Sequence, residues 1–280
     1  MIETVQNSLG ESGGVSVNGG IARQQSWWNT PVIQRRGAAV CFVSIMLALW
    51  QFASGLLPPV LMPGPARVAA RFWAIWTDPN YVGFALSTAY HVLAVVSISF
   101  LLGVSLAVLA YIFPVLDRAI YGRLAPFLNS FSGIGWAFLA VVWFGVTHGA
   151  VVFAASVALL PFAIINAGTG LRELNQDMIE MSVSFSRSSL RRTILVILPM
   201  MVPYLFATLR LCSAIGWHIV PTAELLTGAG GIGSLINFAR QRFATDMIFA
   251  IALFNVLMIF VTDRLIFARV QRWMRKRYGF

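Results

Sequence analysis

The stretch that decides the fold is 171-LRELNQDMIEMSVSFSRSSLRRTILVILP-199, a polar interval with seven charged side chains in a strongly apolar half of the chain. Within residues 171–185 the apolar side chains recur at steps of three and four and the acidic ones fall on another face, which predicts an amphipathic helix. The hydroxyl-rich residues 186–189 are suited to a turn and an N-cap, and a second helix follows as far as Pro199. This hairpin is too charged to cross a bilayer, so we expect it at a membrane surface.

The composition places the rest of the chain in the membrane. Hydrophobic residues make up 58% of the 280 positions and charged residues only 11%, which is too little polar surface for a soluble domain. Cys41 and Cys212 lie in apolar runs without zinc or disulfide spacing. The net charge of +10 comes from basic residues beside hydrophobic spans, so membrane topology explains it better than a nucleic-acid partner does. The sequence predicts an all-α membrane protein in contact with lipid.

Residues 1–36 are rich in Gly, Ser, Asn and Gln, which predicts a disordered cytoplasmic tail without a cleavable signal. Residues 269–280 form a basic cytoplasmic tail. Between the tails we predict a membrane domain over residues 37–268, with six spans at about 37–57, 83–113, 124–146, 150–169, 199–222 and 247–267.

Three connections between these spans have recognisable signals. Prolines close the first span, and the amphipathic segment at residues 66–76 is expected along the outer interface. Residues 114–123 are interpreted as a polar turn. The long uncharged stretch at 124–171 holds two spans, and Thr147-His148-Gly149 is the expected break between them.

The distribution of basic residues predicts the orientation. If both termini are cytoplasmic, the inner segments carry fifteen arginines and lysines, and the outer ones carry only Arg67, Arg71, Arg240 and Arg242. This bias follows the positive-inside rule. It places the loop at 171–198 in the cytoplasm.

The loop resembles the cytoplasmic loop of binding-protein-dependent ABC importer permeases, in which Glu-Ala-Ala is followed by Gly and then by Leu-Pro. Here Met181-Ser182 replaces the alanine pair and Ser186 replaces the glycine. Trp143-Phe144-Gly145 and the Ala-Glu-Leu around Glu224 are similar to the nitrate, sulfonate, taurine and bicarbonate branch. The loop positions that the resemblance assigns to ATPase coupling are Glu180, Met181, Ser182, Ser186, Arg187, Leu198 and Pro199.

The resemblance implies a type I importer permease fold in the cell inner membrane, with coupling helices between spans 4 and 5. It implies as partners a second permease subunit, two ATP-binding cassette ATPase subunits and an extracytoplasmic solute-binding protein. The only lysine, Lys276, lies among arginines and follows no phosphate-binding glycine loop. We therefore expect this chain to hold no cofactor and not to be an enzyme, with ATP and magnesium bound by the partner ATPase.

Catalytic and metal-binding patterns are not recognised. His91, His148 and His218 fall in different spans or turns without metal-ligand spacing, so we interpret them as packing or interfacial residues. A stand-alone secondary transporter or channel is the alternative. It would need coupling-ion carboxylates within the spans, for which we consider Glu224, at an outer end. An intramembrane enzyme is a third and weaker reading.

The expected translocation pathway follows one stripe of the fifth span. Positions seven apart differ by about 20° on a helix, so Arg210, Trp217 and Glu224 share a stripe, with Ser213 beside it and Trp136 as a further candidate. A guanidinium left in lipid costs about 2.5 to 3.5 kcal/mol, so Arg210 is expected to face the dimer interior. There it either pairs with a helix carbonyl of the partner or offers a positive site to an anion.

The orientation can be tested with reporter fusions or cysteine labelling. Six spans with both termini inside predict that Ser188 is reached from the cytoplasm and Thr227 from outside. A result with both positions on one side of the membrane contradicts this topology.

Overall fold

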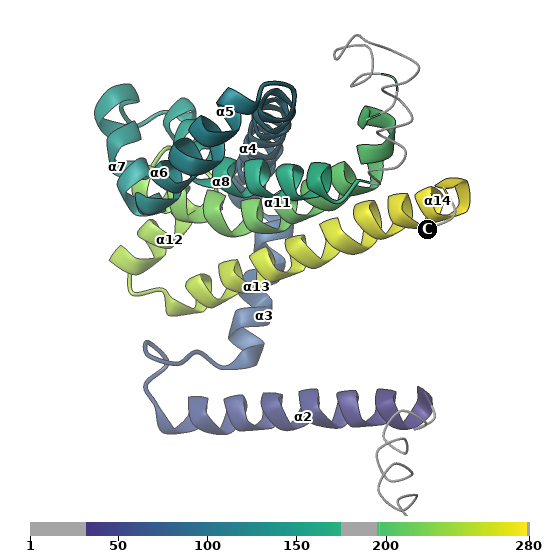
Figure 1. The fold of residues 1–280 in the computed structure, drawn as a ribbon. Coiled ribbons are helices and arrows are strands. Elements are labelled where there is room, and N and C mark those ends of the chain that lie inside the picture. Colours follow the sequence, from purple (N-terminus) through teal and green to yellow (C-terminus); the bar gives the residue numbers. More distant parts are fainter. Residues whose placement is uncertain (1–31, 175–194, 196, 279–280) are drawn as a thin grey trace, which may run out of the picture. The chain divides into compact units, whose positions relative to one another are not determined.

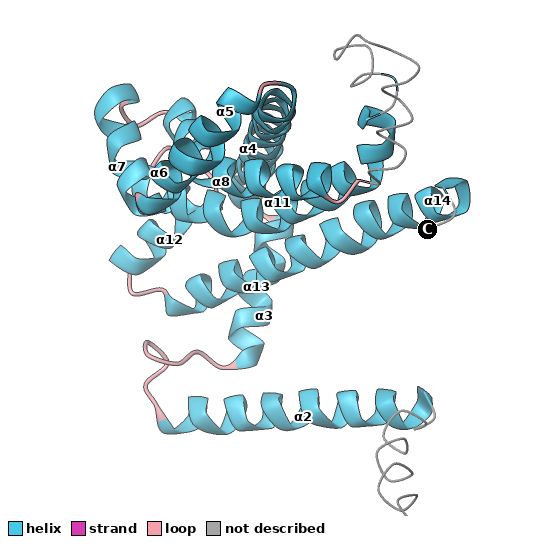
Figure 2. Cartoon of the chain, in the orientation of Figure 1, coloured by secondary structure: helices cyan, strands magenta, loops and turns pink. Residues whose placement is uncertain are grey.

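The structure is a computed structural model that describes residues 32–174, 195 and 197–278. Within these ranges every element is a helix and none is a strand, which confirms the predicted all-α fold (Figure 2). The chain divides into two units, residues 1–56 and residues 57–280.

The first unit contains helix α2 (Val32–Leu56), which covers the predicted first span. The helix ends two residues before Pro58, because proline cannot continue the hydrogen-bond ladder. Its apolar part, Val40–Leu56, is shorter than the roughly 20 residues that usually cross a bilayer. That the chain crosses the membrane six times therefore remains a prediction.

Four helices in the described part of the second unit are long and apolar enough to cross a membrane (Figure 1). The shortest of them has 25 residues, which gives about 37 Å at 1.5 Å per residue and exceeds the hydrocarbon core of about 30 Å. The four are α4 (Pro79–Ile112), α8 (His148–Arg172), α11 (Leu198–Thr227) and the rod Thr245–Arg272, which combines α13 (Thr245–Val261), η4 (Thr262–Phe267) and the first part of α14 (Ala268–Tyr278).

The prediction of a polar turn at residues 114–123 was wrong, because this segment is helical. It forms α5 (Pro114–Ala119) and the π-helix η2 (Ile120–Leu124). Arg172 at the end of α8 lies 3.3 Å from Asp117 and 5.0 Å from the centre of the Tyr121 ring. These contacts connect the charged segment to α8. Turn propensities describe only neighbouring residues, so they do not include such contacts.

The predicted span at 124–146 is broken. It consists of α6 (Ala125–Ser130) and α7 (Gly133–Phe144), and the helical segments on either side of the break meet at 82°. The Ser132 hydroxyl caps α7 by accepting from the Ile134 N–H at 3.3 Å, as expected of a helix start. We call residues 131–133 the elbow.

The break between α7 and α8 lies where the sequence predicts it. Gly145 ends α7 with a positive φ of 68°. Thr147 then caps α8, its hydroxyl accepting from the Ala150 N–H at 3.3 Å. The next helix starts at His148 and therefore carries this histidine in its first turn.

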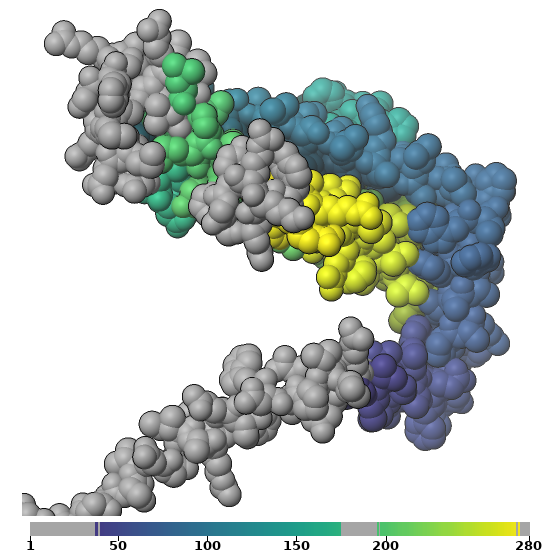
Figure 3. All heavy atoms as spheres, turned by 90° about the vertical axis from the view of Figure 1, so that its right-hand side faces the viewer, coloured from purple at the N-terminus to yellow at the C-terminus, as the bar shows by residue number. Residues whose placement is uncertain are grey.

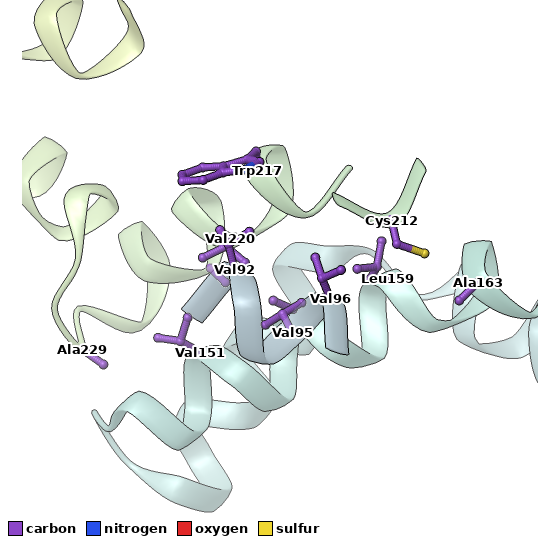
Figure 4. Packing of buried hydrophobic residues seen from close by; sticks show 12 residues of the cluster. Val92, Val95, Val96, Val151, Leu159, Ala163, Cys212, Trp217, Val220 and Ala229 are labelled. Carbon is purple, nitrogen blue, oxygen red and sulfur yellow. The ribbon is translucent and has the colours of Figure 1, made fainter. Parts of the chain in front are cut away.

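The centre of the second unit is the packing of α4 against α8 and α11 (Figure 4). Small residues line the contact: a Cβ at Gly103 would lie 2.5 Å from the Ala163 Cβ, and one at Gly216 would lie 2.9 Å from Val96 Cγ2. The Ser99 hydroxyl donates to the Ser156 carbonyl at 3.1 Å. Small side chains allow such close approach, which drives helix association in lipid.

Two shorter helices pack around the amino-terminal end of α13. Helix α3 (Pro65–Thr77) lies against α13, and Figure 3 shows the yellow C-terminal helices against the blue segment that contains α3. Arg71 on α3 donates to Asp246 at 2.8 Å, and this hydrogen bond raises the pKa of the guanidinium above its ordinary value. Helix α12 (Ile232–Gln241) connects the end of α11 to α13.

The close crossing of α4 and α8 predicts that Gly103→Val destabilises the subunit. Its added atoms have no room beside Ala163, and such overpacking costs about 1 to 3 kcal/mol. We expect a lower melting temperature and a lower yield of the purified complex. The matched control is Gly83→Val on the same helix, because a Cβ at Gly83 meets nothing within 4 Å. Equal loss of stability in both variants contradicts the packing argument.

Candidate functional site

Arg210, near the middle of α11, forms an ion pair within its own chain. Its Nε lies 2.6 Å from Asp263 Oδ1 and its Nη2 lies 2.9 Å from Asp263 Oδ2, a two-pronged contact. Its Nη1 donates to the Gln271 side-chain oxygen at 3.1 Å. Asp263 is a carboxylate of the same subunit and a partner that the sequence-based prediction for Arg210 did not include. A carbonyl of the partner helix or an anion as a further contact of Arg210 stays a prediction.

A cavity of about 470 Å³ opens beside this pair. Its walls are mostly apolar, and the polar groups at it come from Arg210, Asp263 and Gln271. The Asp263 carboxylate neutralises the guanidinium, so the cavity does not present an isolated positive charge. Its apolar walls are Pro203, Phe206, Ala207, Leu211, Ala214 and Met274.

A second polar group, Glu224, is completely buried near the C-terminal end of α11. Its Oε1 lies 2.7 Å from His91 Nδ1 on α4. Its Oε2 accepts from the Thr88 hydroxyl at 2.8 Å and from the Gly233 N–H at 2.9 Å. A buried carboxylate needs such hydrogen-bond donors and a counter-charge. The hydrogen-bond donors come from α4 and α12.

The contacts of Glu224 continue to the protein surface. His91 is also fully buried, and its Nε2 lies 2.9 Å from Nδ1 of His148 on α8. His148 is exposed. The three side chains, here called the polar triad (Glu224, His91 and His148), therefore link a buried carboxylate to the surface through two imidazole rings.

A glycine turn covers the carboxylate. Residues Gly228, Gly230 and Gly231 have positive φ values of 70°, 91° and 87°, which glycine adopts without strain. A Cβ at Gly231 would lie 2.2 Å from the Glu224 carboxyl, and one at Gly233 would lie 2.1 Å from the Pro221 carbonyl. Only glycine fits at these two positions, so the turn and the start of α12 lie directly on Glu224.

The remaining pathway candidates lie inside the subunit. Ser213 and Trp217 are buried at 7% and 6% exposure, and Trp217 belongs to the core cluster that Figure 4 shows. Trp136 is also buried, and its indole N–H donates to the Leu128 carbonyl at 3.3 Å, which supports the elbow. In this subunit Arg210 is partly exposed while the other stripe residues are buried. Their role in a pathway remains a prediction.

Five of the predicted coupling residues lie outside the described part of the chain: Glu180, Met181, Ser182, Ser186 and Arg187. The other two, Leu198 and Pro199, begin α11. Beside the interval, Leu171 and Leu174 pack in one buried cluster with Ile197 and Met201. The two ends of the loop are therefore held together.

Two features were missed in the sequence. Asp263 lies within the last predicted span. It is a carboxylate, besides Glu224, that the secondary-transporter alternative should have included. Its position in an apolar run was a signal, because a carboxylate within a membrane span needs a partner, and Arg210 on the preceding span was one of the cations available to it. The polar triad had no local signal, since its members are 57 and 133 residues apart.

The helical architecture and buried polar groups define a multi-helix membrane subunit, and comparison with known proteins identifies its family. Residues 80–277 match the family described as binding-protein-dependent transport system inner membrane component. The chain therefore belongs to this family of ABC importer permeases.

Individual relatives agree with this assignment. The taurine transport system permease protein TauC of Escherichia coli K12 is 24% identical, covering 84% of this chain and 88% of its own length. The nitrate import permease protein NrtB of Synechococcus elongatus is 24% identical, covering 76% and 80%. The riboflavin transport system permease protein RibX of Chloroflexus aurantiacus is 28% identical, covering 78% and 81%.

A solved structure shows the same fold. A chain of the MetNI methionine ABC transporter in an inward-facing form superposes with a TM-score of 0.59 at 19% identity, covering 67% of this chain and 92% of that chain. The fold is therefore that of an ABC importer permease.

The Arg210–Asp263 pair predicts a characteristic set of variants. Arg210→Gln or Asp263→Asn alone leaves one charge unpaired in a membrane helix, so each is expected to lower the yield of the assembled complex. The double variant removes both charges and is expected to assemble almost as the wild type does. Complex yield and uptake, measured in the same membranes, check this. A double variant that assembles as poorly as the worse single one contradicts a pairing role.

Proposed function

We propose that this permease subunit imports a small anion, such as a sulfonate, nitrate or bicarbonate, delivered by a soluble binding protein. The observation that carries the proposal is the family match from α4 to α14, together with relatives named for taurine and nitrate transport. RibX, named for riboflavin, shows that the family likeness alone does not fix the solute.

The charge of the outer segments supports an anion. With both termini in the cytoplasm, the outer segments carry Arg67, Arg71, Arg240 and Arg242 against Asp78, Glu224 and Asp246, and Arg71 is paired with Asp246, so the excess is one positive charge. A mouth with excess positive charge raises the local concentration of anions. Arg210 contributes less to this attraction than the sequence suggested, because Asp263 neutralises it.

The proposal includes the partners that the family implies. A second permease, identical or different, completes the pathway, and two ATPase subunits bind ATP and magnesium and engage the loop around Glu180. The packed ends of that loop, with Leu174 close to Ile197, support this role because they can transmit movement of the loop to both α8 and α11. ATP hydrolysis is assigned to the separate ATPase chains.

A secondary transporter is not favoured by the carboxylates of the described spans. Asp263 is committed to Arg210, and Glu224 is fully buried with three hydrogen-bond contacts. Neither therefore offers an unpaired carboxylate to a metal coupling ion such as Na⁺.

The proposal is tested by uptake into proteoliposomes that contain the permease, its ATPase and its binding protein. We expect ATP-dependent uptake of taurine, nitrate or bicarbonate, and ATPase activity that rises with loaded binding protein. Glu180→Lys reverses a charge in the coupling loop, so it is expected to reduce ATPase association and uptake at least tenfold while membrane insertion stays normal.

The matched control is Glu173→Lys, a charge reversal at the end of α8 outside the assigned coupling positions. Normal uptake by the Glu180 variant contradicts the coupling role. Uptake of none of these three solutes, nitrate, bicarbonate or the sulfonate-bearing zwitterion taurine, in a complex with active ATPase, contradicts the proposed substrate class.

A further inference from the structure

We propose that the polar triad is a proton-binding site that responds to the pH at the outer face and holds the glycine turn and α12 in place. This inference rests on the orientation in the proposed function, which puts the start of α8 and the end of α11 outside.

The first step is the charge of Glu224. The structure places this carboxylate at 0% exposure, and its titratable partner is His91, also at 0%. Thr88 and Gly233 supply neutral donors. An ionised carboxylate in this position therefore depends on a proton within the triad for its counter-charge.

In the described part of the chain, no lysine or arginine forms a hydrogen bond or an ion pair with Glu224, so the positive charge has to come from a proton on the triad. Helix α4 adds Tyr90, whose ring lies 5.9 Å from the His91 ring. On α11 the nearest other titratable group is His218, which is exposed and lines two other cavities. On α12 the Arg240 side chain donates to Asn237. On α8 the group facing His91 is His148 itself.

The second step is that one hydrogen-bond pattern serves both protonation states. Without the extra proton, His148 Nδ1–H donates to His91 Nε2, and His91 Nδ1–H donates to Glu224 Oε1, at the observed 2.9 Å and 2.7 Å. A proton from water then forms a new N–H bond at Nε2 of the exposed His148. No hydrogen bond is lost, and the net charge of the triad changes from −1 to 0.

The third step connects this charge to the outer segment. The Gly233 N–H donates to Glu224 Oε2, and the Ile232 N–H donates at 2.7 Å to the Thr88 hydroxyl, which in turn donates to Glu224. The Ser234 hydroxyl lies 3.3 Å from the Glu224 carbonyl oxygen and 2.9 Å from that of Gly230. The start of α12 is therefore attached to the carboxylate through backbone amides.

Loss of the proton favours movement of the glycine turn away from Glu224. When the triad loses its proton, the carboxylate remains as an uncompensated buried charge, and access of water stabilises it. Water reaches it when the glycine turn, which lies on the carboxyl group, moves away. An acidic outer solution therefore keeps the turn and α12 attached, and an alkaline one releases them.

Amide hydrogen exchange of the complete transporter in lipid nanodiscs tests this. We expect the protection factors of residues 232–234, corrected for the intrinsic pH dependence of exchange, to fall at least tenfold between pH 6 and pH 8.5. Glu224→Gln is neutral at both pH values, so its protection is expected to change less than twofold. His148→Lys supplies a fixed charge at an exposed position and is expected to keep protection high at pH 8.5.

His218→Gln is the control, because it removes an exposed histidine from the same helix without touching the triad. It is expected to keep the wild-type pH dependence. Protection that does not vary with pH in the wild type overturns the proposal, as does an unchanged pH dependence in the Glu224 and His148 variants.

A second measurement separates this inference from the proposed function. Uptake into proteoliposomes with independently set pH on each side is expected to change with the pH of the binding-protein side and not with that of the ATPase side. Exchange requires only the folded complex, so a pH-dependent exchange without anion uptake overturns the proposed function alone. Anion uptake with a pH-independent exchange overturns the proton-binding site alone.

Discussion

The close contact of α4 with α8 and α11 is the constraint on which the rest of the second unit depends. Lipid offers apolar side chains the same environment as a neighbouring helix does, so association relies on tight packing and interhelical hydrogen bonds. Gly103 against Ala163, Gly216 against Val96 and the Ser99 hydroxyl on the Ser156 carbonyl provide both. These contacts fix how far each helix is shifted along its neighbours.

That register positions the polar groups. From the Gly103–Ala163 contact, His91 is 12 residues away along α4 and His148 is 15 residues away along α8, distances of about 18 Å and 22 Å. The two imidazoles therefore arrive at similar depth, where they meet at 2.9 Å. Polar groups within a bilayer must be satisfied by the protein itself, and here packing of small residues at one level creates the polar contact at another.

Sequence patterns predicted helices and turns that depend on neighbouring residues. They did not predict side-chain contacts between residues far apart in the sequence. Apolar runs located the long helices, and the turn at 147–149 was visible because Gly145 and Thr147 have strong local preferences. The segment at 114–123 was misread, although Pro114 at the first helical position and Asp117 in the first turn are local signals of a helix start. The Arg210–Asp263 pair could have been predicted by listing the charged residues within the spans. The contacts among His91, His148 and Glu224 depend on how α4, α8 and α11 pack, which the sequence does not show.

The end of α11 shows how a short motif acquires its meaning from the fold. The glycines of GGIGS follow Glu224, the centre of the Ala-Glu-Leu motif, by six to nine residues in the sequence. In the structure they pack together, because Gly231 leaves the space that the carboxylate occupies, Gly233 lets α12 approach the backbone of α11, and the Gly233 amide donates to the carboxylate. A larger residue at 231 displaces the carboxylate, one at 233 collides with the Pro221 carbonyl, and a residue without an acceptor at 224 leaves the Gly233 amide unpaired. The acidic residue and the glycines therefore constrain each other, and the histidines of α4 and α8 connect the carboxylate to the surface.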